Sequence, residues 1–354
     1  MRADLPAAIG ELLGSVSRPT LAFDAARIAE NLARFAAVGR EVGATVLFAA
    51  KSFPRAEVWA LAADALDGFD AASPGEVAAL PPARVVSIAD PTGAALASVP
   101  RAARVLASCE TPAQIAAAPP GAELALRVSM STGRDPALGA ILDGTGHRRS
   151  RFGVSDLRVL AAAARGRRVG LHVHHGPLTA ATGARFADTA RDVLALAAAA
   201  EVEPAFLDLG GAWHGLADPG AALRELRAAI PAGIELVVEP GRLFAAGAGF
   251  ALGRVAAVRE EAGRVLRVCE LSRLCHLRWS PVELVGRAPH PGDAAPSVWV
   301  GPTCSEDDAL GEWPVARAAF AAGDAFALRG ATGYAVAWNT GFGGVPPADV
   351  VFVS

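Results

Sequence analysis

The sequence predicts a (β/α)8 barrel followed by a second, mostly β domain. Between about residues 44 and 239, short β-branched apolar runs alternate with Ala-, Leu- and Arg-rich stretches of helical periodicity. This is the pattern of parallel strands that are joined by crossover helices. After Arg242 the alternation stops, and short strand-like runs are separated by Gly and Pro. We therefore expect the barrel over residues 24–245 and the β domain over residues 1–23 and 246–354.

Eight apolar runs are expected to form the barrel strands. They are Thr45–Ala50, Asp67–Asp70, Arg84–Ile88, Arg104–Ala107, Leu124–Ser129, Val169–His174, Ala205–Leu209 and Ile234–Val238. Eight strands within about 200 residues favour a closed barrel. The alternative is a doubly wound open sheet, but no GxGxxG follows the first strand, which weakens a dinucleotide-binding version of that fold.

Helical segments fall between these runs. The first, Ala25–Ala37, follows Asp24 as its N-cap and places Ile28, Leu32 and Phe35 on one face. The others are Pro54–Ala63, Pro74–Leu80, Asp156–Ala164, Gly183–Ala199 and Ala221–Ala229. In the second domain the expected strands are Gly253–Arg259, Val265–Glu270, Ser297–Gly301, Ala325–Arg329 and Ala348–Val353.

Composition excludes several classes of protein. A net charge of -3 over 354 residues leaves no electrostatic footprint for nucleic acid or an anionic membrane. The longest apolar runs are far shorter than the roughly 20 residues of a membrane span, and no secretory signal is visible. The 4 cysteines lack CxxC spacing, so we expect neither a disulfide scaffold nor a metal site. The expected protein is soluble and cytoplasmic.

The basic residues are unevenly divided between the two types. Of 33 Lys and Arg residues, Lys51 is the only lysine, and Tyr334 is the only tyrosine. A guanidinium stays protonated in proteins, whereas an ammonium can lose its proton and act as a nucleophile. If the bias of this sequence towards arginine replaced every other lysine, Lys51 occupies a position where an arginine could not do the required chemistry.

The carboxyl ends of the expected strands carry a chemically coherent set of residues. They are Lys51, Asp70, Arg127, His174, the Gly210-Gly211 pair, Glu239 and Arg242. In a (β/α)8 barrel these ends form the active-site face. A desolvated lysine suits Schiff-base formation, and a Gly-rich turn near an arginine suits a phosphate. A carboxylate can hold a protonated pyridine nitrogen, so the set predicts a pyridoxal 5'-phosphate site.

The order of these motifs resembles the fold-type III pyridoxal phosphate decarboxylases, which include ornithine and diaminopimelate decarboxylases and share their barrel with alanine racemase. The stretches that carry the resemblance are PTLAFDAARIAENLARF (19–35), VLFAAKSFP (46–54), GFDAASPGEVAAL (68–80), RSRFGV (149–154), GLHVHHG (170–176), LDLGGAWHG (207–215), ELVVEPGR (235–242), GPTCSEDDAL (301–310) and GYAVAWNTGFGG (333–344). They span nearly the whole chain, and EPGR, GPTC and the strand-one lysine are specific to the group.

The resemblance implies a role for each residue. Lys51 is the Schiff-base lysine, His174 stacks on the cofactor ring, and Glu239 pairs with the pyridine nitrogen. Gly210, Gly211, Arg242 and Tyr334 surround the phosphate, while Asp70 and Arg127 support the ring and the histidine. Cys304 matches the cysteine that reaches the neighbouring subunit's site and returns a proton after carbon dioxide leaves. The resemblance thus implies a homodimer with shared active sites and a small amino-acid substrate.

Several positions depart from the family pattern. The hydroxyl residue after the stacking histidine is Pro177, the third glycine of the turn is Ala212, and the asparagine after the lysine is Phe53. The expected Asp-Gly pair reads Glu270-Leu271. The acid that follows the cysteine, which holds a basic substrate's distal ammonium, is Ser305.

These departures predict a working enzyme with an atypical substrate. Glu306, Asp307 or Glu270 would replace the missing acid, or the substrate lacks a distal ammonium. His276 and Arg278 match a basic stretch that in some members meets a substrate carboxylate. The group serves polyamine, lysine, siderophore-like and antibiotic pathways, so specialised metabolism is one expectation.

Two alternatives remain beside decarboxylation. An amino-acid racemase of this fold needs a second base, typically tyrosine, and an arginine at the pyridine nitrogen. Here the residue at that nitrogen is Glu239, and Tyr334 falls on the decarboxylase phosphate motif. A catalytically altered, cofactor-binding regulator is the other alternative, which the substitutions at Pro177 and Ser305 leave open. His172, His174 and Asp208 could share a face as metal ligands, but no further His or Cys completes a set.

Overall fold

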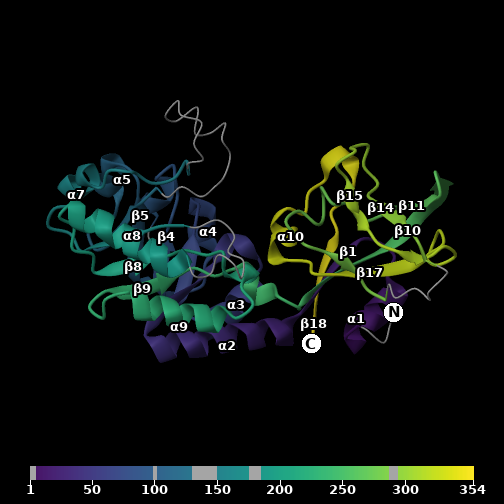
Figure 1. Ribbon diagram of the computed structural model, residues 1–354, viewed down its shortest axis with the longest axis horizontal. Helices are drawn as coiled ribbons and strands as arrows, with labels where there is room; N and C mark the ends of the chain where they lie inside the picture. Colours follow the sequence, from purple (N-terminus) through teal and green to yellow (C-terminus); the bar gives the residue numbers. More distant parts are fainter. Residues whose placement is uncertain (1–4, 99–101, 130–149, 175–184, 287–293) are drawn as a thin grey trace. The chain divides into compact units, whose positions relative to one another are not determined.

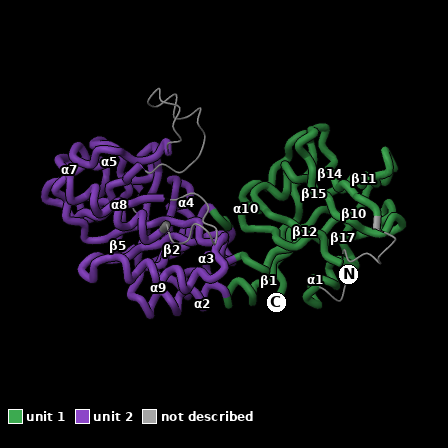
Figure 2. The backbone as a smooth tube through the Cα atoms, viewed as in Figure 1, with its two compact units in different colours: residues 1–30, 52–54, 245–354 green, residues 31–51, 55–244 purple. Residues whose placement is uncertain are grey.

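A computed structural model describes residues 5–98, 102–129, 150–174, 185–286 and 294–354. The chain divides into two compact units (Figure 2). The barrel unit comprises residues 31–51 and 55–244, and the β unit comprises residues 1–30, 52–54 and 245–354. Among the described residues, no helix is both long and apolar enough to cross a bilayer.

The barrel unit is a closed ring of eight parallel strands in sequence order, among the residues that the structure describes (Figure 1). The strands are β2 (Ala44–Ala49), β3 (Gly68–Ala71), β4 (Ala83–Ile88), β5 (Ala102–Cys109), β6 (Glu123–Arg127), β7 (Val169–His172), β8 (Phe206–Asp208) and β9 (Glu235–Val238). Val46 of β2 pairs with Val238 of β9 and closes the ring. The predicted barrel is confirmed, and the open-sheet alternative is wrong.

Helices cover the outside of this ring (Figure 1). They are α2 (Ala25–Val42), α3 (Ala56–Ala65), α4 (Pro74–Ala79), α5 (Pro112–Ala117), α7 (Arg158–Ala163), α8 (Arg185–Ala199) and α9 (Pro219–Ala229). Short 3-10 turns complete the connections: η2 (Ala50–Ser52), η3 (Ala94–Ala97), η4 (Trp213–Gly215) and η5 (Arg242–Ala245). Of these helices, α5 was not predicted.

Side-chain caps explain where several helices begin. The Asp24 carboxylate accepts the Arg27 N–H at 2.9 Å, as expected for the first helix. Ser73, Thr111 and Asp218 cap α4, α5 and α9 in the same way, and a proline follows each of them. Proline suits the first helical position because its missing N–H would have no partner there.

The β unit contains a larger sheet and a short two-stranded sheet. Its strands are β1 (Thr20–Asp24), β10 (Gly249–Glu261), β11 (Arg264–Cys269), β12 (Glu283–Leu284), β13 (Ala294–Ala295), β14 (Ser297–Val300), β15 (Ala309–Glu312), β16 (Val315–Ala316), β17 (Ala325–Arg329) and β18 (Asp349–Val353). The five strands expected here are present. The unit also holds three short helices that were not predicted: α1 (Ala7–Ser15), α10 (Gly333–Ala337) and the 3-10 turn η6 (Phe342–Gly344).

Phe53 has a packing role in the β unit. Its ring lies 4.6 Å from that of Phe23 and stacks on Phe352 at 5.9 Å. A Cβ on Gly333 would lie only 2.5 Å from Phe53, so glycine is required at the start of α10. The departure from the family asparagine is therefore explained by core packing.

An ion network closes the amino-terminal end of the barrel. Arg104 at the start of β5 donates two hydrogen bonds to Glu123 and two to Glu235, at 2.7 to 2.9 Å. Thr45 also donates to Glu235, and Arg168 pairs with Glu123. The two carboxylates are thus matched by cations where the strands begin.

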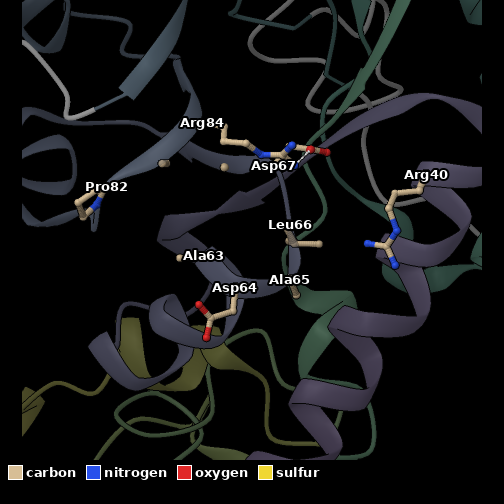
Figure 3. Close-up of a pocket in the computed structure, with 10 residues that line it drawn as sticks. Arg40, Ala63, Asp64, Ala65, Leu66, Asp67, Pro82 and Arg84 are labelled. Carbon is tan, nitrogen blue, oxygen red and sulfur yellow. Dashed lines mark hydrogen bonds and ion pairs between the residues drawn. The ribbon is translucent and has the colours of Figure 1, made fainter.

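The surface beside this network is hollowed. A cavity of about 440 Å³ lies where β3 and β4 start, and it is lined in part by Arg40, Asp64 and Arg84 (Figure 3). Arg84 forms an ion pair with Asp67 in this cavity. The hollow lies at the opposite end of the strands from Lys51.

We expect Arg104→Met to lower the free energy of unfolding by about 2 kcal/mol, because half-buried Glu235 loses its two hydrogen bonds from Arg104, whereas Glu123 keeps its ion pair with Arg168. Burial raises the pKa of Glu235, but hydrogen bonds from Arg104 and Thr45 outweigh it, and the pKa lies below its usual value near 4.5. The contribution is therefore complete above about pH 4.5 and disappears as the pH falls through the lowered pKa.

Chemical denaturation at pH 7 and pH 3 measures this effect. Arg224→Met is the matched control, because Arg224 makes an equally short bidentate pair with Glu41 on the exposed surface. It should change stability much less than Arg104→Met does, because solvent screens an exposed ion pair. Equal effects of the two substitutions would show that the barrel-end network contributes no more to stability than an exposed ion pair does.

Candidate active site

Lys51 lies at the carboxyl end of the first barrel strand. The strand β2 ends at Ala49, and the following turn η2 carries Lys51 over the barrel mouth. Its ammonium donates to Asp70 at the end of β3. The Asp70 side chain is fully buried, whereas that of Lys51 is 38% exposed. A buried carboxylate therefore anchors an amine that stays accessible.

Glu239 lies beside Lys51 because the β2–β9 ladder continues past both strands. The Ala49 N–H donates to the Pro240 carbonyl at 3.1 Å, and the Glu239 N–H donates to the Gly210 carbonyl at 2.9 Å. Glu239 is 4% exposed. Burial, together with the charges of Asp208 and Asp70, raises the pKa of Glu239 well above its ordinary value. This environment therefore favours the protonated form of the carboxyl group.

His172 and Asp208 lie next to Glu239. The Nε2 atom of His172 is 3.9 Å from Glu239 Oε2, and its Nδ1 atom shares a 2.7 Å hydrogen bond with Ser108. Burial, with the nearby charges of Arg127, His174 and Lys51, lowers the pKa of His172 well below 6.5. The imidazole is therefore neutral.

The Gly210-Gly211 turn fits closely between a histidine and the Glu239 backbone. Gly210 has φ +61°, and a Cβ there would lie 2.5 Å from His174 Nδ1. The Gly211 N–H donates to the same nitrogen at 3.3 Å, and a Cβ on Gly211 would lie 2.8 Å from the Glu239 carbonyl oxygen. Both glycines are therefore sterically required, and His174 is held against the turn.

Arg242 and His214 follow this turn and the EPGR stretch. Arg242 begins η5 and is half-buried. His214 lies in η4, and its burial, with the charge of Arg242, lowers its pKa to about 4. The neutral imidazole of His214 and the positively charged Arg242 thus lie near the Gly-Gly turn. Such an environment favours the binding of an anion.

Arg127 supports the opposite side of the barrel mouth. It lies at the end of β6, is 7% exposed and pairs with Glu110 at 3.2 Å. Its guanidinium also lies over the Phe152 ring at 4.4 Å. The predicted residues Lys51, Asp70, Arg127, His174, Gly210, Gly211, Glu239 and Arg242 therefore all lie at the carboxyl ends of the barrel strands.

The β unit carries the predicted substrate residues. Cys304 is a free, exposed thiol, Ser305 is half-buried, and Glu306 is exposed. Tyr334 packs edge-on against Trp279 with ring centroids 5.1 Å apart. Arg278 is exposed and lies over the Trp338 ring at 4.6 Å.

The predicted substrate contact of His276 is not supported by its surroundings. His276 is completely buried, and its Nδ1 atom accepts the Ser272 N–H at 3.0 Å. Its Nε2 atom donates to the Pro346 carbonyl at 3.0 Å. Both ring nitrogens are occupied inside the β unit, so of the predicted basic pair only Arg278 is open to a substrate. Pro177 lies outside the described residues.

A family profile described as "Pyridoxal-dependent decarboxylase, pyridoxal binding domain" matches residues 26–246, which is more than half of the chain. The chain belongs to the pyridoxal-dependent decarboxylases. The matched range begins in α2 and ends after η5, so it takes in the whole barrel. No curated protein sequence matches the chain.

Solved structures of the same fold cover nearly the entire chain. The Paramecium bursaria Chlorella virus arginine decarboxylase bound to agmatine superposes with a TM-score of 0.76 at 17% identity, over 100% of both chains. The lysine/ornithine decarboxylase of Vibrio vulnificus complexed with cadaverine gives 0.75 at 19% identity, over 98% of both chains. The diaminopimelate decarboxylase of Helicobacter pylori complexed with L-lysine gives 0.74 at 17% identity, over 98% of this chain and 94% of that chain.

The residues at the mouth of this pyridoxal-dependent decarboxylase fit its cofactor, pyridoxal 5'-phosphate. Among the described residues, no hydrogen-bond donor reaches Asp70 Oδ1 or Glu239 Oε1, although both oxygens are buried. Unsatisfied buried carboxylate oxygens are rare unless a further group completes them. A protonated pyridine nitrogen would supply the missing donor at Glu239, and the glycine turn leaves room that any side chain would fill.

Four polar residues near this mouth were not among the predicted site residues. They are Glu76, His172, Asp208 and His214, all in stretches that carry the family resemblance. Burial raises the pKa of Glu76, whose carboxylate accepts the Ala72 N–H at 2.7 Å. The sequence indicated His172 and Asp208 only as candidate metal ligands, although each lies near the end of a barrel strand. No sequence pattern indicated that His214 would lie near the site.

We expect Ala212→Gly to raise the free energy of unfolding by about 1 kcal/mol, because Ala212 has φ +74°. A left-handed conformation strains every side chain with a Cβ, and glycine removes the strain. Ala195→Gly, in the exposed middle of α8, is the control and should lower stability by about 1 kcal/mol. Denaturant titration measures both, and a loss of stability in Ala212→Gly would contradict this account of the turn.

Proposed function

We propose that this chain decarboxylates an amino acid or an amino-acid derivative with pyridoxal phosphate held on Lys51. The observation that carries the proposal is that the sole lysine, held by Asp70, lies at the same barrel mouth as Glu239, a buried carboxyl group whose pKa is raised well above its ordinary value. When it is bound, the cofactor supplies an electron sink for the bond between the α-carbon and the carboxylate.

The chain's own residues then have distinct tasks. Asp70 positions the Lys51 amine through a buried ion pair, and Glu239 holds a proton where the pyridine nitrogen lies. His174, held against the Gly210-Gly211 turn by the Gly211 N–H, would stack on the ring. Arg242, which follows the side-chain-free turn, would bind the phosphate. Because the residue at the nitrogen is an acid and not an arginine, decarboxylation is favoured over racemisation.

The exposed Cys304 thiol is the proposed proton donor to the α-carbon after carbon dioxide has left. Since the matching cysteine of the family serves the neighbouring subunit, we propose a homodimer with shared active sites. A cytoplasmic location is part of the same proposal.

The proposed substrate is atypical at its distal end. Ser305 offers a hydroxyl where a basic substrate needs an acid, and Arg278 presents a guanidinium on the Trp338 face. A carboxylate or an acyl-modified amine would pair with these groups better than a free ammonium would. Glu306 and Glu270 are the acids that would serve a basic substrate instead, and the buried Oε2 atom of Glu270 has no hydrogen-bond partner within the described parts of the chain. Such a substrate is consistent with a role in siderophore, antibiotic or other specialised metabolism.

We expect Lys51→Arg to abolish the visible absorbance of bound pyridoxal phosphate and all carbon dioxide release. The substitution keeps the positive charge beside Asp70 but removes the nucleophilic amine. Absorbance spectroscopy and a carbon dioxide assay measure the two losses, with circular dichroism as the folding control. Cofactor absorbance that persists in Lys51→Arg and in Lys51→Ala would disprove the proposed site.

A panel of basic, acidic and acyl-modified amino acids tests the substrate class. If the substrate ends in a carboxylate, Arg278→Met should raise KM by roughly 10- to 100-fold, which corresponds to one charge-assisted hydrogen bond. Glu306→Gln is the matched control and should leave KM unchanged. The opposite order of effects would indicate a basic substrate, and racemised product without carbon dioxide would indicate a racemase.

A further inference from the structure

Beneath the proposed pyridine-nitrogen acid lies a group of polar side chains, which we call the buried acid group: Ser108, His172, Asp208 and Glu239. Asp208 ends β8, His172 ends β7, and Ser108 lies on β5. All four side chains are at most 4% exposed. The reactive atoms of His172, Asp208 and Glu239 lie within 4.8 Å of one another. A single proton shared between two of these three groups would be enough to hold them together, so the group needs no metal cation.

We propose that Asp208 is a positioning residue that shares one proton with Glu239 and thereby keeps the pyridine nitrogen of the cofactor protonated. This inference rests on the proposed function. In this proposal the negative charge of Asp208 stabilises the protonated pyridine nitrogen. His172 is a neutral neighbour and does not offset the charge of Asp208.

The charge balance of the mouth supports the proposal. Three buried carboxyl groups, Asp70, Asp208 and Glu239, surround the single lysine, while Arg127 is already paired with Glu110. Two carboxylates in contact cannot both stay ionised in a dry environment. Burial raises the pKa of Asp208 to about 6, and burial with the neighbouring acids raises that of Glu239 well above its ordinary value. The pair therefore favours retention of one proton.

The hydrogen bonds of Asp208 explain why it remains the charged partner. The Gly210 N–H donates to its Oδ1 atom at 2.9 Å, and this favours the carboxylate. Its Oδ2 atom is buried and has no hydrogen-bond partner among the described residues, so it can accept the proton that we propose it shares with Glu239. When a pyridine nitrogen lies at Glu239, the O–H bond of Glu239 breaks and an N–H bond forms. The two carboxylates then hold the proton on the nitrogen.

His172 completes the group without adding charge. Its Nδ1 atom is bonded to the Ser108 hydroxyl, which can donate or accept, so Nε2 can face Glu239 with either a lone pair or an N–H. The imidazole thus suits Glu239 with and without its proton. The other charged or titratable groups that face the buried acid group are Lys51 from η2, Asp70 from β3, Arg127 from β6 and His174 after β7.

The direct test is the protonation of the cofactor nitrogen in the loaded enzyme. The protein is loaded with pyridoxal phosphate that carries 15N in the ring, and the nitrogen chemical shift is followed against pH. Asp208→Asn preserves the acceptor for the Gly210 N–H but removes the charge. It should lower the apparent pKa of the nitrogen by about 1 to 2 relative to the unsubstituted enzyme.

Two further variants separate charge from packing. His172→Gln should move the nitrogen pKa by less than about 0.5, because a neutral group replaces a neutral group. Asp90→Asn removes another buried carboxylate of the barrel unit, which accepts hydrogen bonds from Thr92 and Ala95. It should lower stability and leave the nitrogen unchanged. An unchanged nitrogen in Asp208→Asn, or a marked rise in His172→Gln, would overturn the proposal.

The cofactor-free protein provides a second, independent readout. The folded state keeps a proton on Glu239 that the unfolded state loses above about pH 4.5, so this stabilisation is lost as the pH rises through the raised pKa. Asp208→Asn should flatten that decline between pH 5 and 8. If the cofactor does not bind, the proposed function fails while this measurement still tests the shared proton. One equivalent of tightly bound zinc in the purified protein would also overturn the proposal, since a metal would take the proton's place.

Discussion

Closure of the barrel between β9 and β2 is the constraint on which the rest of the structure depends. The pairing of Val46 with Val238 joins segments that are almost 200 residues apart in the sequence. The Ala49–Pro240 hydrogen bond extends that pairing beyond the strands and brings Lys51 next to Glu239. Lys51 and Glu239, which are distant in the sequence, thus lie at the same mouth of the barrel. Every proposed step depends on this proximity.

The two ends of the barrel treat buried charge differently. At the amino-terminal end Arg104 satisfies both Glu123 and Glu235 with four hydrogen bonds. At the carboxyl end the carboxyl groups outnumber the cations, and oxygens of Asp70, Asp208 and Glu239 lack donors among the described residues. A network of matched charges stabilises the fold, whereas unmatched buried acids shift their pKa values and become available for chemistry. The contrast marks the carboxyl end as the site without reference to any relative.

Much of this arrangement could be predicted because barrels follow simple rules. Alternating apolar runs located all eight strands, and the predicted site residues Lys51, Asp70, Arg127 and Glu239 lie in or directly after the last residues of these runs. Short helices such as α1 and α10 were missed, since their hydrophobic periodicity is too brief to recognise. The substrate contact of His276 stays a prediction, which the sequence could not weigh against packing, because its two ring nitrogens are used by backbone groups of Ser272 and Pro346.

The sequence by itself determined the barrel, its pyridoxal phosphate cofactor and the special standing of Lys51, because these depend on local periodicity, motif order and residue type. Only the tertiary structure decided which charges are matched. The sharing of a proton between Asp208 and Glu239, the neutrality of His172 and the strain at Ala212 all depend on distances and burial. Such properties arise between strands that are distant in the chain, so no local pattern of residues encodes them.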